Sequence, residues 1–110
     1  LVVDRTGRRV IFDGVELSIE PRDFDAFVLL AEEAADAGGW VLRDSISASV
    51  QASTGRDGNP EQADRCINRL RAAFRNLASV IEVPRHAFIE TKPKVGYRLA
   101  FAKSEIGFMA

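Results

Sequence analysis

Residues 60–79 place the strongest constraint on how this chain can fold. Their apolar side chains recur every three or four residues, which is the period of an α-helix that buries one face. These apolar positions are Ala63, Ile67, Leu70, Phe74 and Leu77. With about 100° between successive residues, the opposite side of the predicted helix holds only polar or small side chains. Such a helix must pack its apolar side against a core and leave the other side in solvent.

The outward face of this helix is basic and rich in amide groups. It holds Glu61, Arg65, Asn68, Arg69, Ala72 and Asn76, with Gln62 and Arg75 beside them and Arg71 nearer the apolar side. In the major groove of DNA, arginine recognises guanine and asparagine recognises adenine. We therefore expect Arg65, Asn68 and Arg69 to face base edges. Taken alone, the helix is also compatible with a solvated surface whose arginines have no particular function.

A predicted β-hairpin at 88–101 carries further positive charge. β-Prone segments at 88–91 and 97–101 flank a short turn, KPKVG, that holds two lysines and a proline. A cationic hairpin tip can lie along a phosphate backbone or enter the minor groove, although lysine at a turn can also serve only to protect a sheet edge. The residues that we expect to hold phosphates are Arg71, Arg75, Lys92, Lys94 and Arg98.

The N-terminal part of the chain predicts a small antiparallel sheet. Short β-prone segments at 1–3, 9–12 and 15–19 are separated by turn signals, of which Asp13-Gly14 is the strongest. Three such segments joined by tight turns indicate a meander with one solvated face.

Two more helices are predicted before residue 60. Helical periodicity covers about 21–35, where a glycine pair ends it, and about 43–52. Acidic side chains on the first helix are expected to be solvated or to form a docking face for a partner. They are Asp23, Asp25, Glu32, Glu33 and Asp36. Trp40 is expected in the core, and the tail 104–110 is expected to be loose or to pack against something outside this chain.

Composition bounds the classes of function. The formal net charge is −1, but residues 1–59 hold six Lys or Arg and eleven Asp or Glu, whereas residues 60–103 hold nine and four. Such asymmetry indicates nucleic acid or an acidic partner, unless it is chance scatter in a small domain. The single cysteine excludes an internal disulfide and favours a reducing compartment such as the cytoplasm. No apolar run approaches the roughly 20 residues of a membrane-spanning helix.

Residues for other chemistry are sparse. Cys66 and His86 are each the only residue of their type, and two isolated ligands do not make a metal site. No glycine-rich phosphate loop and no GxSxG nucleophile turn is present, so we expect no cofactor and no enzyme activity. Cys66 is expected to be an inert, half-buried thiol, with a redox switch on the outward face as the alternative. The 110 residues fit one domain, and because they begin with Leu1 we expect that domain to be part of a longer protein.

Three stretches resemble the OmpR/PhoB-type winged-helix effector domain of bacterial response regulators. The first is IEPRDFDAFVLLAEEA (19–34), which is similar to the opening of the family's first helix. The second is QADRCINRLRAAFRNL (62–77), which follows the recognition-helix pattern with Asp64, Ile67, Leu70, Arg71 and Phe74 in register. The third is FIETKPKVGYRL (88–99), which follows the wing pattern with Ile89, Thr91, Gly96, Tyr97 and Arg98 in register.

The resemblance implies an α+β winged helix-turn-helix domain over residues 1–103, built from the N-terminal meander, three helices and a C-terminal β-hairpin wing. It implies sequence-specific binding of duplex DNA by the output domain of a bacterial transcription regulator. The helix at about 60–79 would enter the major groove, and the wing at about 88–101 would lie over the adjacent minor groove.

The same resemblance implies further contacts. Asn68, Arg69 and Arg71 occupy DNA-contacting positions, and the 52–60 loop lies where family members can contact RNA polymerase. We expect an isolated domain of this kind to be monomeric, to pair only weakly on tandem DNA sites and to have no contact with a membrane.

Some residues depart from the family pattern. Glu61 stands where an arginine or a small polar residue is common, Cys66 stands where a histidine is common, and the KPKVG turn replaces a more usual Arg-Gly pair. Together with the near-neutral net charge, these departures leave a second hypothesis open. In that hypothesis the winged helix is a protein–protein interaction module that regulates a partner without reading DNA.

Overall fold

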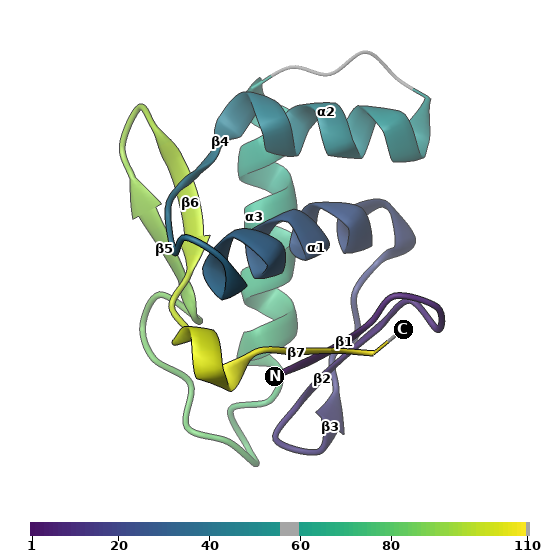
Figure 1. Ribbon diagram of the computed structural model, residues 1–110, viewed down its shortest axis with the longest axis vertical. Coiled ribbons are helices and arrows are strands. Elements are labelled where there is room, and N and C mark those ends of the chain that lie inside the picture. The colour runs from purple at the N-terminus through teal and green to yellow at the C-terminus, as the bar shows by residue number, and fades with distance from the viewer. Residues whose placement is uncertain (56–59, 110) are drawn as a thin grey trace.

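The computed structural model of the chain describes residues 1–55 and 60–109 (Figure 1). Its elements are β1 (Val2–Asp4), β2 (Arg9–Phe12), β3 (Val15–Glu16), α1 (Pro21–Ala35), β4 (Val41–Leu42), α2 (Arg43–Thr54), α3 (Pro60–Arg75), β5 (Ile89–Lys92), β6 (Gly96–Leu99), the 3₁₀ turn η1 (Lys103–Glu105) and β7 (Gly107–Met109). This order confirms the predicted α+β class, with strands before and after the helices.

The helices enclose the core of the domain. In Figure 1, α1 and α2 lie in front of α3, which runs behind both of them. Phe27 of α1, Ile46 of α2, and Ile67 and Phe74 of α3 are all fully buried. The apolar spacing read from the sequence is therefore the spacing that packs α3 against its neighbours. Within the described ranges, no helix is both long and apolar enough to cross a membrane.

The ends of the helices differ from the prediction in two places. α1 begins at Pro21 as expected, because a missing N–H group costs nothing at a first helical position. α2 continues to Thr54, slightly beyond its expected end, and α3 ends earlier than expected, at Arg75. After Arg75 the backbone forms tighter bonds, such as the Leu77 N–H to the Phe74 carbonyl at 3.0 Å. Leu77 is still buried, so the apolar spacing outlasts the regular helix.

The N-terminal meander belongs to a four-stranded sheet in the order β3-β2-β1-β7. β1 and β2 pair antiparallel, as predicted, with Val3 opposite Val10. The C-terminal segment adds β7, which pairs with β1 in parallel. The expectation of a loose tail is therefore wrong for residues 104–109, because the Gly107 N–H donates to the Leu1 carbonyl at 2.8 Å. Figure 1 shows β1 and β7, which come from opposite ends of the sequence, side by side in this sheet.

The predicted C-terminal hairpin is the core of a second sheet, in the order β4-β6-β5. Tyr97 of β6 lies opposite Thr91 of β5 on one side and Val41 of β4 on the other. The preceding residue, Gly96, must lack a side chain, because a Cβ atom there would collide with the carbonyl group of Val41. The glycine of the wing motif therefore allows β4 to lie directly against the hairpin.

Candidate nucleic-acid interface

Arg69, which the sequence places on the outward face of α3, forms an ion pair with α1. Its Nε donates to Asp23 Oδ2 at 2.7 Å, and its Nη2 donates to Asp23 Oδ1 at 2.8 Å. The Asp23 side chain is 1% exposed and the Arg69 side chain is 27% exposed. A carboxylate so deeply buried needs a partner of opposite charge, and Arg69 supplies it. The expectation that Asp23 is solvated is therefore wrong, and Arg69, which is predicted to face base edges, is held to α1 by this ion pair.

The sequence held a signal for this ion pair. Asp23 precedes Phe27, Leu30 and Ala34 by four, seven and eleven residues, which is the spacing of a single helix face. A carboxylate on that face must enter the core together with its apolar neighbours. The spacing therefore marks Asp23 as buried, although it does not show which basic residue reaches it.

Cys66 lies on the side of α3 that faces the core, and it is fully buried. Burial raises the pKa of its thiol far above the usual range, and the nearby Asp23 carboxylate raises it further. The thiol therefore remains protonated and unreactive near neutral pH. The expected half-buried position is wrong, and a redox switch on the outward face has no exposed sulfur to act through.

Arg71, which is expected to hold a phosphate, instead joins α3 to the wing. Its Nη2 donates to the Ile89 carbonyl at 2.9 Å and to Thr91 Oγ1 at 2.7 Å. The guanidinium carbon also lies 5.8 Å from the centre of the Tyr97 ring. Burial lowers the pKa of Arg71, which is consistent with a cation drawn into the protein. Arg71, a predicted phosphate ligand, therefore already has partners within the protein.

Arg69 and Arg71 delimit one uncovered face of α3. They lie about 160° apart around the helix on its outward side, so α1 flanks one edge of this face and β5 flanks the other. The exposed residues between them, which we call the outer stripe, are Glu61, Arg65, Asn68, Ala72, Arg75 and Asn76. The sequence-predicted residues Arg65 and Asn68 therefore do share an accessible surface.

Two arginines of the outer stripe have only light contacts. Arg65 Nη2 lies 3.3 Å from Glu61 Oε2 one turn earlier, with side-chain exposures of 64% and 76%. Arg75 Nη2 donates to the carbonyl of Arg85 at 3.3 Å. An exposed pair of this kind is worth about 0–1 kcal/mol, so a ligand can displace it at little cost.

Asp64, in register with the recognition-helix motif, ties together α2, α3 and β6. Its carboxylate accepts hydrogen bonds from Arg43, with Nη2 at 2.6 Å, and from the hydroxyl of Tyr97. The Tyr97 and Arg43 hydrogen bonds lower the pKa of Asp64, while burial and the Asp64 carboxylate raise the pKa of Tyr97 to about 12. Asp64 therefore positions α3 and is not part of the outer stripe.

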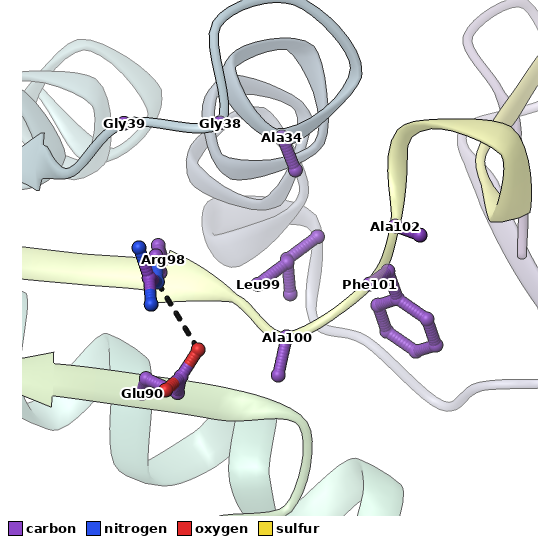
Figure 2. A pocket seen from close by; sticks show the side chains of 9 residues that line it. All are labelled: Ala34, Gly38, Gly39, Glu90, Arg98, Leu99, Ala100, Phe101 and Ala102. Carbon is purple, nitrogen blue, oxygen red and sulfur yellow. Dashed lines mark hydrogen bonds and ion pairs between the residues drawn. The ribbon is translucent and has the colours of Figure 1, made fainter.

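Trp40 is not a core residue as expected, but supports two cations of the wing sheet. The Arg98 guanidinium lies 4.3 Å from its ring centre and Lys92 Nζ lies 5.9 Å away. Arg98 Nε also donates to Glu90 Oε1 at 3.1 Å. Figure 2 shows this pair at one side of a hollow of about 340 Å³ between the end of α1 and the segment after β6. Arg98 is therefore another predicted phosphate ligand that already has partners in the protein.

The tip of the hairpin is the most accessible basic part of the wing. Lys92, Pro93 and Lys94 are all exposed. The turn is closed by the Val95 N–H, which donates to the Lys92 carbonyl at 3.0 Å. Lys94 has a backbone φ of 65°, which turns the chain sharply at this point. The predicted loop at 52–60 includes residues 56–59, which lie outside the described part of the chain.

Comparisons with known proteins agree with this architecture. No family model and no curated protein matches the chain. Among solved structures, it is similar to the DNA-binding domain of CadC from E. coli, with 25% identity, a TM-score of 0.61, and coverage of 84% of this chain and 78% of that one. It is also similar to the C-terminal DNA-binding domain of RstA from Klebsiella pneumoniae, with 28% identity, a TM-score of 0.65, and coverage of 89% and 81%. The predicted winged-helix fold and the resemblance to OmpR/PhoB-type effector domains are confirmed.

Proposed function

We propose that this chain binds duplex DNA in a sequence-specific manner, as the output domain of a bacterial transcription regulator. The observation that carries the proposal is the outer stripe of α3, which is exposed along the helix while the arginines at both its edges are fixed to α1 and β5. A helix held on both sides with its polar face open is suited to enter a groove. The similarity to two DNA-binding domains supports the same conclusion.

The dimensions of α3 fit the major groove. An α-helix with its side chains is about 10–12 Å across, and the major groove is about 12 Å wide. Recognition helices contact base edges through their N-terminal residues; Arg65 lies in the first half of α3 and Asn68 lies just past its midpoint. In this proposal, Arg65 reads guanine and Asn68 reads adenine, whereas Arg69 fixes the edge of the outer stripe to α1.

The wing supplies electrostatic contacts beside the groove. Lys92 and Lys94 at its tip and Arg75 on the outer stripe are exposed cations that can approach phosphates. Arg71 and Arg98 hold the wing in place through contacts within the protein. With about three or four phosphate contacts, the logarithm of the association constant should fall with the logarithm of salt concentration at a slope of about −3 to −4.

The proposal can be tested by titrating the whole chain into a fluorescent random-sequence duplex at low salt and following anisotropy. Binding should weaken steeply with salt, and Arg65→Ala should weaken binding to the preferred sequence more than binding to random duplex. Arg5→Ala is a matched control, because Arg5 is an exposed arginine just after β1 whose ion pair, at 3.9 Å, is with Glu32 of α1 and not with the outer stripe. Binding no stronger than that of a neutral control protein would contradict DNA binding and favour the protein-interaction module.

Contacts beyond DNA belong to the same proposal. An interaction with RNA polymerase through the 52–60 loop and weak pairing of copies on tandem sites are its expected consequences. Both can be measured once a preferred DNA sequence is known, by comparing single and paired sites with and without polymerase.

A further inference from the structure

A carboxylate lies on the surface that is proposed to face DNA. Glu61 belongs to the outer stripe, and its side chain is 76% exposed. It lies in the first turn of α3, one turn before Arg65 and on nearly the same side of the helix. A negative charge here opposes the phosphate backbone, so its position calls for an explanation beyond general affinity.

Part of the explanation is structural. A carboxylate in the first turn of a helix interacts favourably with the helix dipole, and Glu61 also forms an ion pair with Arg65 at 3.3 Å. The dipole effect is available at any first-turn position, whereas the ion pair requires Glu61 to lie on the same side of the helix as Arg65. These effects stabilise the helix, and they leave the Glu61 carboxylate exposed on the proposed base-reading face.

The chemistry of the major groove offers a specific partner for this carboxylate. An ionised carboxylate can only accept hydrogen bonds. The groove presents two base donors, the N4 amine of cytosine and the N6 amine of adenine. Adenine also places the acceptor N7 beside its amine, which would repel a carboxylate, whereas cytosine presents only the donor. Cytosine is therefore the base whose amine can donate to Glu61 without an opposing contact.

We propose that Glu61 is a specificity-determining residue that accepts a hydrogen bond from the N4 amine of a cytosine while Arg65 binds a nearby guanine. This inference rests on the proposed function of α3. The two residues are separated by about 6 Å along the helix axis, which is less than two base steps of about 3.4 Å. The cytosine and the guanine should thus lie in neighbouring base pairs or one pair apart.

The same carboxylate discriminates against other sequences. When no cytosine amine is present, Glu61 loses water in the groove, lies near phosphates and gains no hydrogen bond. Binding to unrelated duplex is therefore weakened by the residue that strengthens selection of the correct site. Removing the carboxylate should raise affinity for random DNA and lower the ratio of specific to non-specific binding.

The test is selection from a pool of random duplexes by the whole chain, followed by sequencing of the bound fraction. Glu61→Ala should lose the preference for cytosine at one position and keep the preferences elsewhere. Arg65→Ala should lose a guanine preference at a different position. Glu82→Ala removes an equal charge from an exposed position outside α3 and should leave all preferences unchanged.

A base analogue then tests the hydrogen bond directly. Replacing the selected cytosine by 2-pyrimidinone, which lacks the N4 amine, should weaken wild-type binding about 5- to 150-fold. The same replacement should weaken Glu61→Ala much less, because that variant makes no contact with the amine. Comparison of the two proteins removes the effect of the analogue on duplex stability.

Three outcomes overturn the inference in distinguishable ways. If Glu61→Ala keeps the cytosine preference, Glu61 does not read the base. If Glu61→Ala and Arg65→Ala lose the same guanine preference, Glu61 only positions Arg65. If the wild-type protein enriches no sequence and binds no duplex at low salt, the proposed function itself fails.

Discussion

Replacement of Arg69 by methionine should destabilise the protein strongly, because it leaves the Asp23 carboxylate without its cationic partner. Methionine keeps an apolar stem that can fill the same space, so the change isolates the charge. Removal of one member of a buried ion pair typically costs 3–5 kcal/mol. Arg69 is 27% exposed, so water can partly replace it, and we expect a loss of about 2–4 kcal/mol in the free energy of unfolding.

The measurement is urea denaturation of the wild type and variants, with the slope of the transition checked for constancy. Arg65→Met makes the same chemical change on the same helix, but in a pair that is 64% and 76% exposed. It should therefore cost only about 0–1 kcal/mol. In a domain of this size, the loss of about 2–4 kcal/mol expected for Arg69→Met corresponds to a fall in Tm of about 10 °C.

A double variant separates loss of charge from loss of packing. Asp23→Leu combined with Arg69→Met replaces both charges by apolar groups and should recover most of the stability, since buried ion pairs exchange for apolar pairs at little cost. If Arg69→Met proves as stable as Arg65→Met, the Asp23 carboxylate must be hydrated in solution and the reasoning fails.

Three further predictions test the wing and its supports. Lys94→Ala should weaken binding to all DNA sequences alike and reduce the salt slope by about 1, whereas the exposed Lys103→Ala should not; anisotropy titrations decide this. Gly96→Ala should destabilise the fold by about 2 kcal/mol or more, because its Cβ has no room beside β4, and a near-normal Tm would contradict that geometry. Asp64 has a lowered pKa, so its contribution to stability is complete above about pH 4 and is lost as pH falls further; Asp64→Asn should flatten the acid side of the stability curve, and an unchanged pH profile would show that the carboxylate contributes nothing through Tyr97.

Periodicity predicted the elements well, because burial depends on the sequence spacing of apolar residues. The apolar stripe of α3 and the strand-turn-strand pattern of the wing each lie within about twenty residues, so local sequence is sufficient to identify them. β7 was missed for the opposite reason. It is three residues long and pairs with β1 at the other end of the chain, so no local pattern distinguishes it from a loose tail.

The candidate site was predicted less completely, because a helical wheel describes only one helix. The wheel correctly placed Arg65 and Asn68 on the outward side of α3. It also placed Arg69 there, since it contains no information about where α1 begins or how deeply Asp23 is buried. For the same reason, the sequence could not show that Arg71 reaches β5 instead of solvent.

The count of basic residues therefore overstates the charge available for DNA. Arg69, Arg71 and Arg98 all make hydrogen bonds to other parts of the protein that hold α3 and the wing in position. Non-specific affinity grows with the number of phosphates neutralised, so we expect a domain that uses its arginines internally and keeps a carboxylate at Glu61 to bind random DNA weakly. Selectivity depends on the ratio of specific to non-specific affinity, and a low affinity for random DNA raises that ratio without any additional base contact.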